Sequence, residues 1–129
     1  MVDMWRIVLA DDHREIRRGL RALLTDNGDM EVIGEAADGA EAIDIASRLR
    51  PDVLITDLKM PRYDGVEVTR RVRELSPETV IIIFSLYDSA IYRHAALVAG
   101  AARFLNKKTD NNTLVDIIRE VTSSRDGLE

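Results

Sequence analysis

Cysteine is absent from the 129-residue chain, which excludes disulfide frameworks, thiol catalysis and cysteine-ligated zinc sites. No apolar run approaches the ~20 residues that a membrane-spanning helix needs. Residues 1–6 do not have the pattern of a signal peptide. We therefore expect a cytoplasmic protein in a reducing compartment, without contact with a membrane.

Positive charge is in deficit, because 18 Lys and Arg stand against 23 Asp and Glu, for a net charge of −5. Proteins grip phosphate backbones with basic faces, so we do not expect this domain to bind nucleic acid by itself. The length of 129 residues, with 46% hydrophobic residues, predicts one soluble domain that folds without disulfides or structural metal.

Two kinds of apolar pattern alternate along the chain. Short runs rich in Ile and Val suit strands that are buried on both faces. These runs are residues 7–10, 32–37, 53–56, 80–84 and 101–105. Between and after them, apolar residues recur at helical spacing. The five helical stripes are Ile16, Leu20, Leu23 and Leu24; Ala42, Ile45, Ala46 and Leu49; Val68, Val72 and Leu75; Ile91, Ala95 and Val98; and Leu114, Ile117, Ile118 and Val121.

This alternation predicts an α/β fold with five βα units, (βα)5, in which an open parallel sheet of five strands is doubly wound with helices on both faces. A closed barrel would need eight such units. Asp110 is a suitable N-cap for the last helix. We expect the domain to span residues 1–123, with 124–129 as a flexible tail or the start of a linker to an output domain that this chain does not contain.

Polar residues follow four of the five predicted strands. Ligands of open parallel sheets bind beyond the carboxyl ends of the strands, so these residues are expected to converge. They are Asp11 and Asp12 after the first strand, Asp57 after the third, Ser85 after the fourth, and Lys107 and Lys108 after the fifth. The sequence thus predicts a site with three carboxylates, a hydroxyl and an ammonium group.

Three neighbouring carboxylates repel one another, at ~4 kcal/mol for each close pair when the effective dielectric constant is near 20. A hard divalent cation such as Mg²⁺ removes this repulsion and leaves room for a phosphoryl oxygen. An ammonium group and a hydroxyl suit further phosphoryl oxygens. One carboxylate can then act as the nucleophile, so the pattern predicts an aspartate that accepts a phosphoryl group.

Four motifs in this order resemble the receiver domain of bacterial two-component response regulators, over roughly residues 6–123. They are the acidic pair Asp11-Asp12 that ends residues 7–12, residues 57–61 with Asp64-Gly65, residues 85–88, and residues 100–107. The Ser-Leu-Tyr-Asp stretch at 85–88 and the lack of proline after Lys107 are most similar to the NarL/FixJ subfamily. In that subfamily a helix-turn-helix DNA-binding domain usually follows the receiver.

The resemblance implies a flavodoxin-like sheet with strand order 2-1-3-4-5. It also implies that a sensor histidine kinase phosphorylates Asp57 and that the domain acts as a switch, not as an enzyme, assisting only its own phosphorylation and dephosphorylation. The implied Mg²⁺ ligands are Asp11, Asp12, Asp57 and the backbone carbonyl of Lys59. The implied phosphoryl-binding and switch residues are Ser85, Phe104 and Lys107, and Lys59 and Tyr87 modulate dephosphorylation.

Phosphorylation is further expected to move Phe104 from solvent into the protein and to promote a homodimer, with DNA contacted only through the missing output domain. Phe104 stands where tyrosine is frequent in the family, and Lys108 where an acidic residue is common. We expect His13 and His94 to be solvated, without an acidic partner at ligand spacing. Arg17, Arg18 and Arg21 are expected on the exposed face of the first helix.

Three other functions stay open at this point. A stand-alone receiver would act through protein–protein binding with no DNA-binding domain. An α/β phosphohydrolase with an aspartyl-phosphate intermediate would need an acid two residues after the nucleophile, where Lys59 stands. A flavodoxin-like cofactor carrier is disfavoured because Asp11 and Asp12 would repel a phosphate group.

Overall fold

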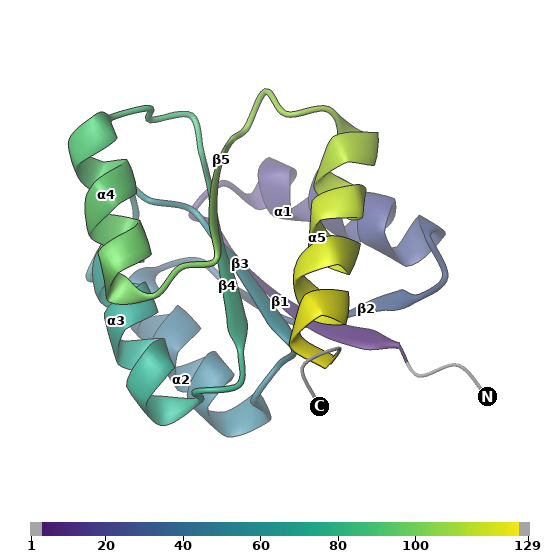
Figure 1. Cartoon of the computed structure of the whole chain (residues 1–129), viewed down its shortest axis with the longest axis horizontal. Helices are drawn as coiled ribbons and strands as arrows, with labels where there is room; N and C mark the ends of the chain where they lie inside the picture. Colours follow the sequence, from purple (N-terminus) through teal and green to yellow (C-terminus); the bar gives the residue numbers. More distant parts are fainter. Residues whose placement is uncertain (1–3, 127–129) are drawn as a thin grey trace.

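The computed structural model describes residues 4–126, in which five strands alternate with five helices (Figure 1). The strands are β1 (Trp5–Ala10), β2 (Met30–Ala36), β3 (Val53–Thr56), β4 (Val80–Ser85) and β5 (Arg103–Asn106). The helices are α1 (Arg14–Asp26), α2 (Gly39–Leu49), α3 (Gly65–Leu75), α4 (Ala90–Ala99) and α5 (Asn111–Asp126). The (βα)5 prediction is therefore confirmed.

All strand pairs are parallel, and the strand order is β2-β1-β3-β4-β5, as the resemblance implied. The register aligns Ala10 with Thr56, Thr56 with Ile83 and Ser85 with Asn106, so β4 and β5 extend two residues beyond β1 and β3 in the same direction. The residues that follow them consequently share one edge of the sheet. β2 is an edge strand and lies away from the centre of that row.

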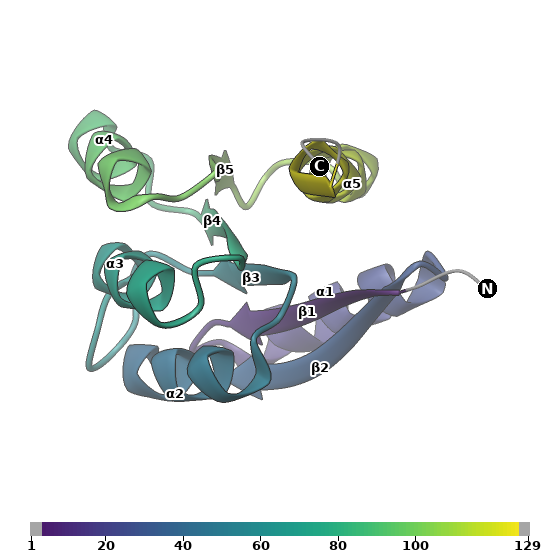
Figure 2. The ribbon, with the colours of Figure 1, turned by 60° about the horizontal axis from the view of Figure 1, so that its bottom comes forward.

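The helices cover both faces of the sheet (Figure 2). Alternate residues of β1 separate the two layers: Ile7 and Leu9 pack with α1 and α5, whereas Val8 and Ala10 pack with α2 and α3. α4 covers the end of the second face, where Ala96 packs with Ile83 and Phe104. This double layer explains why the strands are apolar on both sides.

Helix ends follow from local sequence. Asp110 caps α5 as expected, since its Oδ1 accepts a hydrogen bond of 2.9 Å from the backbone N–H of Thr113. α5 runs to Asp126, so it includes the first three residues of the segment 124–129 that was expected as a tail. The rest of that segment, 127–129, lies outside the described residues. Between residues 4 and 126, no helix is both long and apolar enough to cross a membrane.

The apolar spacing of residues 91–98 correctly predicts a helix, but this stripe does not face the core in α4. Ile91 and Val98 are 79% and 73% exposed, and the residue of α4 that is fully buried is Ala96. α4 is apolar around most of its circumference, so spacing could not show which side faces the sheet. Close packing against Phe104 then selects the side with a small residue. Leu75 at the end of α3 is likewise exposed, in contrast to Val68 and Val72.

Substitution by alanine is predicted to change the stability of the fold in opposite directions at two glycines that lie in helices. A Cβ on Gly19, within α1, would meet no atom of the described residues within 4 Å. A Cβ on Gly65 would lie 2.5 Å from the backbone oxygen of Asp57. We expect Gly19→Ala to raise the free energy of unfolding by about 0.5–1 kcal/mol through helix propensity. Gly65→Ala should lower the free energy of unfolding by about 1–3 kcal/mol, because the backbone around Asp57 must move to admit the new Cβ.

Urea unfolding of the two variants and the wild type measures both changes. Changes of the same sign in the two variants would contradict the packing described for Gly65.

Arg119 of α5 holds the loop between α1 and β2. Its Nε donates to Asp29 Oδ2 at 2.9 Å and its Nη2 donates to Asn27 Oδ1 at 3.2 Å. The hydrogen bond from Arg119 lowers the pKa of Asp29 below its ordinary value of 3.8. Because the folded-state pKa is the lower one, the ion pair stabilises the fold fully above pH 3.8 and this contribution is lost as the pH falls through the folded-state pKa.

We therefore expect Arg119→Gln to raise the pKa of Asp29 and to cost stability at neutral pH but not in acid. A carboxyl NMR titration measures the pKa. Arg103→Gln, which removes an exposed ion pair with Glu120, is the control and should leave the pKa of Asp29 unchanged. An unchanged pKa of Asp29 in Arg119→Gln would refute the assignment.

Candidate functional site

Backbone hydrogen bonds between strand ends bring the predicted residues together. The N–H of Asp57 donates to the carbonyl of Ala10 at 2.8 Å, and the N–H of Lys107 donates to the carbonyl of Ser85 at 2.9 Å. Asp11, Asp57 and Ser85 are buried. This edge of the sheet thus brings the buried carboxylates of Asp11 and Asp57 together with the hydroxyl of Ser85 and the side chain of Lys107.

Lys107 bridges these two carboxylates. Its Nζ lies 2.6 Å from Asp11 Oδ2 and 3.0 Å from Asp57 Oδ2, and its side chain is only 7% exposed. Burial by itself lowers the pKa of Lys107, but the hydrogen bonds to Asp11 and Asp57 outweigh it and raise the pKa above 10.5. The ammonium charge therefore offsets part of the repulsion expected between the carboxylates.

The carboxylate of Asp57 is also held by its own loop. The backbone N–H of Leu58 donates to Asp57 Oδ1 at 2.7 Å, while Oδ2 faces Lys107. The N–H of Gly65 donates to the carbonyl of Leu58 at 2.8 Å, which places the start of α3 directly beside Asp57. The carboxylate is thereby positioned before any ligand arrives.

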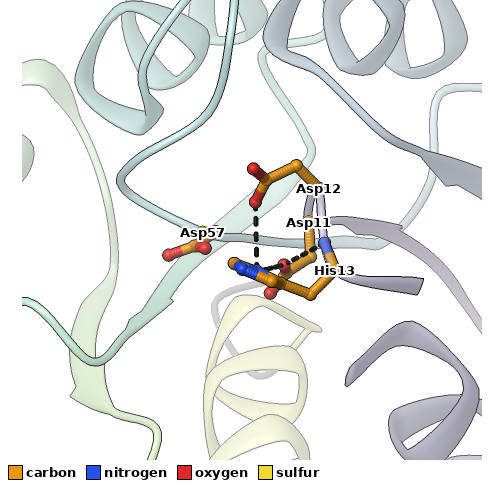
Figure 3. A group of neighbouring side chains, drawn as sticks. All are labelled: Asp11, Asp12, His13 and Asp57. Carbon is orange, nitrogen blue, oxygen red and sulfur yellow. Dashed lines mark hydrogen bonds and ion pairs between the residues drawn. The ribbon is translucent and has the colours of Figure 1, made fainter. Parts of the chain in front are cut away.

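Asp12 and His13 complete the cluster (Figure 3). His13 Nδ1 lies 3.0 Å from Asp11 Oδ1 and 3.1 Å from Asp12 Oδ1. One ligand atom from each of Asp11, Asp12, His13 and Asp57 falls within 4.8 Å of the others. The three carboxylate oxygens of this set are ligands of the kind that hard divalent cations prefer.

The expectation that His13 lacks an acidic partner is wrong. Its ring is 65% exposed, yet Nδ1 points into the acidic cluster, where the hydrogen bond with Asp11 and the charges of Asp12 and Asp11 raise its pKa above 6.5. The direct succession of His13 after two acids was the signal for this contact. For His94, an exposed residue of α4, no such contact is found among the described residues.

A pocket of about 260 Å³ opens beside Asp57. The residues that line it are His13, Asp57, Lys59, Ser85, Leu86, Tyr87 and Lys107. Ser85 Oγ accepts a hydrogen bond of 3.0 Å from the N–H of Tyr87, so its own proton can still be donated. A small anion at this point would meet a hydroxyl, an ammonium group and a carboxylate.

Comparison with known proteins decides the family. Residues 7–119 match the profile of the response regulator receiver domain. The chain belongs to this family. The sequence of this receiver domain is 40% identical over 128 residues to the transcriptional regulatory protein LiaR of Bacillus subtilis, and 38% identical over 117 residues to the oxygen regulatory protein NreC of Staphylococcus carnosus.

The chain covers only part of these relatives. The LiaR match includes 98% of this chain and 60% of LiaR, and the NreC match 90% and 54%. The receiver domain of NarL from Mycobacterium tuberculosis has a TM-score of 0.90 at 33% identity, covering 94% of this chain and 98% of that one. A LuxR-family response regulator from Aurantimonas sp. SI85-9A1 has a TM-score of 0.89 at 32% identity, covering 95% and 88%.

Lys59 of the receiver domain is held by two tyrosines. Its Nζ lies 4.5 Å from the ring centroid of Tyr87 and 4.4 Å from that of Tyr92, and the two rings meet edge to face at 5.3 Å. This cation–π contact ties the loop after β3 to the loop before α4 and to α4 itself. Tyr92 was not singled out from the sequence, because a tyrosine on a helix carries no signal of such a contact.

Phe104 is 5% exposed and packs with Leu58, Ile83 and Ala96. The guanidinium of Arg93 lies 4.8 Å from its ring centroid and donates to its backbone carbonyl at 3.1 Å. The side chain therefore already occupies the interior, which the resemblance associates with the phosphorylated state. Arg93 was another contact that the sequence did not reveal.

Arg17 differs from the expected exposed residue. Its Nη1 donates to the backbone carbonyl of Asp11, and its Nε donates to Glu35 Oε1 at 3.0 Å. It thus supports the loop that carries the acidic pair. Arg18 and Arg21 are exposed as expected, although Arg21 also pairs with Glu35.

Loss of the Lys107 ammonium should destabilise the domain. Lys107→Met leaves Asp11 and Asp57 as neighbouring buried charges, so we expect the free energy of unfolding to fall by on the order of 3 kcal/mol. Urea unfolding in the presence of a chelator measures this change. Lys108→Met is the matched control, because Lys108 is exposed and should change little. Equal effects of the two substitutions would rule out the bridging role of Lys107.

Proposed function

We propose that this receiver domain is a phosphorylation-activated switch that accepts a phosphoryl group on Asp57 from a sensor histidine kinase. The observation that carries the proposal is the position of Asp57 Oδ2. It lies 3.0 Å from Lys107 Nζ and lines the pocket that holds Ser85. A nucleophile, an ammonium group and a hydroxyl thus face one space large enough for a phosphoryl group.

Mg²⁺ fits the donor set at this edge of the sheet. Asp11, Asp12 and Asp57 contribute carboxylate oxygens within 4.8 Å of one another, and the backbone carbonyl of Lys59 is the fourth proposed ligand. When bound, the ion supplies charge neutralisation between the attacking carboxylate and the phosphoryl oxygens. The acidic cluster supports this assignment through its composition.

The transfer needs only groups that the chain provides. A carboxylate oxygen of Asp57 attacks the phosphorus of the kinase phosphohistidine. The new P–O bond forms as the P–N bond breaks, and the imidazole leaves with the electron pair. Lys107 then pairs with a phosphoryl oxygen in place of its contact with Asp57 Oδ2, and the Ser85 hydroxyl donates to another. In autodephosphorylation, water attacks the phosphorus, the P–O bond to Asp57 breaks, and inorganic phosphate leaves the free carboxylate behind. Lys59 and Tyr87 modulate the rate of this step from the pocket wall.

The output is proposed to be transcription control in the cytoplasm. LiaR and NreC are longer than this chain, which supports a DNA-binding domain beyond the receiver in the native protein. Ser85 and Phe104 join the phosphoryl site to α4, whose exposed Ile91 and Val98 form an apolar face suited to a homodimer contact after phosphorylation.

Intact mass spectrometry tests the phosphoacceptor. We expect wild type incubated with Mg²⁺ and a small acyl phosphate to gain the mass of one phosphoryl group, and expect no gain when the metal is chelated. Asp57→Asn should show no gain, because the nucleophilic oxygen is lost. Asp44→Asn, at an exposed carboxylate of α2, is the control and should behave as wild type.

A phosphoryl gain in Asp57→Asn equal to that of wild type would contradict the proposal. A receiver that accepts only from its kinase would show no gain with the acyl phosphate. Beryllofluoride, which imitates the phosphoryl group, then serves as the second probe, and absence of a complex with wild type would exclude Asp57 as the acceptor.

A further inference from the structure

We infer that His13 provides a nitrogen ligand that lets the acidic pocket bind a divalent transition-metal ion, such as Ni²⁺ or Zn²⁺, in preference to Mg²⁺. The inference deepens the metal site of the proposed function by naming a further ligand and the class of ion. It rests on the imidazole that enters the cluster between the carboxylates of Asp11 and Asp12 (Figure 3).

The geometry brings the nitrogen to the carboxylates. His13 Nδ1 is 3.0 Å from Asp11 Oδ1 and 3.1 Å from Asp12 Oδ1, and it lies within 4.8 Å of an oxygen of Asp57. An ion with ligand distances near ~2.1 Å can join atoms up to ~4.2 Å apart, so only small movements are needed to gather these atoms around one ion.

The backbone keeps His13 in this position. Its N–H donates to Asp11 Oδ1 at 2.9 Å, and Arg17 holds the backbone carbonyl of Asp11 from α1. His13 is also the N-cap residue of α1, with extended backbone angles that differ from those of the helix. The donor atoms are thus arranged by the strand-to-helix turn itself, which reduces the ordering that metal binding requires.

The donor types determine the preferred ion. Mg²⁺ takes oxygen ligands and retains several waters, so an imidazole adds little to its binding. Imidazole suits Zn²⁺, Ni²⁺ and Cu²⁺, and affinity for mixed nitrogen and oxygen sites rises along the series from Mn²⁺ to Cu²⁺. A pocket with three carboxylates and one imidazole therefore binds the later transition metals more tightly than carboxylates alone would.

Calorimetric titration of the untagged chain with Ni²⁺ and, separately, Mg²⁺ tests this ligand. We expect His13→Ala to weaken Ni²⁺ binding by about 10–100-fold, the size of effect known for groups that support metal ligands, and to change Mg²⁺ binding by less than about threefold. His94→Ala is the matched control, because His94 is the second of the two histidines and lies on α4. It should bind both ions as wild type does.

A spectroscopic measurement identifies the bound atom. In ¹⁵N-labelled protein, Zn²⁺ should shift the Nδ1 resonance of His13 and leave that of His94 unchanged. Equal Ni²⁺ affinity in wild type and His13→Ala, or an unmoved Nδ1 resonance, would overturn the inference. Equal weakening of Ni²⁺ and Mg²⁺ would also overturn it, because His13 would then act only by positioning the carboxylates.

The two proposals can fail separately. If wild type gains no phosphoryl group and binds no beryllofluoride, but Ni²⁺ binding depends on His13, the phosphoacceptor role fails and the nitrogen ligand stands. If wild type is phosphorylated with Mg²⁺ but Ni²⁺ binding is independent of His13, only the inference about His13 fails.

Discussion

The ammonium group of Lys107 allows two buried carboxylates to share one edge of the sheet. Asp11 and Asp57 come from β1 and β3, and the lysine reaches them from the end of β5, across β4. Its position depends on the parallel register of β4 and β5 and on the hydrogen bond from the backbone N–H of Lys107 to the carbonyl of Ser85. The strand order therefore determines the charge balance of the site. A ligand that binds the ammonium group of Lys107 must also change its contacts with the two carboxylates.

The fold and most of the site could be predicted because strands in a parallel sheet end together. Residues that follow such strands must meet, so Asp11, Asp57 and Lys107 are found together without any knowledge of side-chain conformation. The contact of His13 with the acidic pair depends on how one side chain turns at the start of α1, as does that of Arg17 with Asp11. The position of His13 next to Asp11 and Asp12 makes its contact possible, but sequence spacing does not determine the side-chain conformations that form these contacts.

The error in α4 has a different physical origin. Periodicity identifies the buried side of a helix only when the other side is polar, and α4 has apolar residues on both. The structure buries Ala96 against Phe104 and leaves Ile91 and Val98 exposed. Apolar side chains that stay in water do not gain the free energy of burial. An exposed apolar face of this kind is suited to a contact with a further protein.

The lack of a hydroxyl on Phe104 has a consequence for how this position can be buried. A buried tyrosine at this position would require a hydrogen-bond partner for its hydroxyl, and an unsatisfied hydroxyl costs about 1–3 kcal/mol. The phenyl ring of Phe104 has no such requirement. The guanidinium of Arg93 lies over this ring and donates a hydrogen bond to the backbone carbonyl of Phe104. The buried position of Phe104 is therefore stabilised by packing and by the contact with Arg93 alone, whereas a tyrosine in the same position would need a polar partner inside the protein.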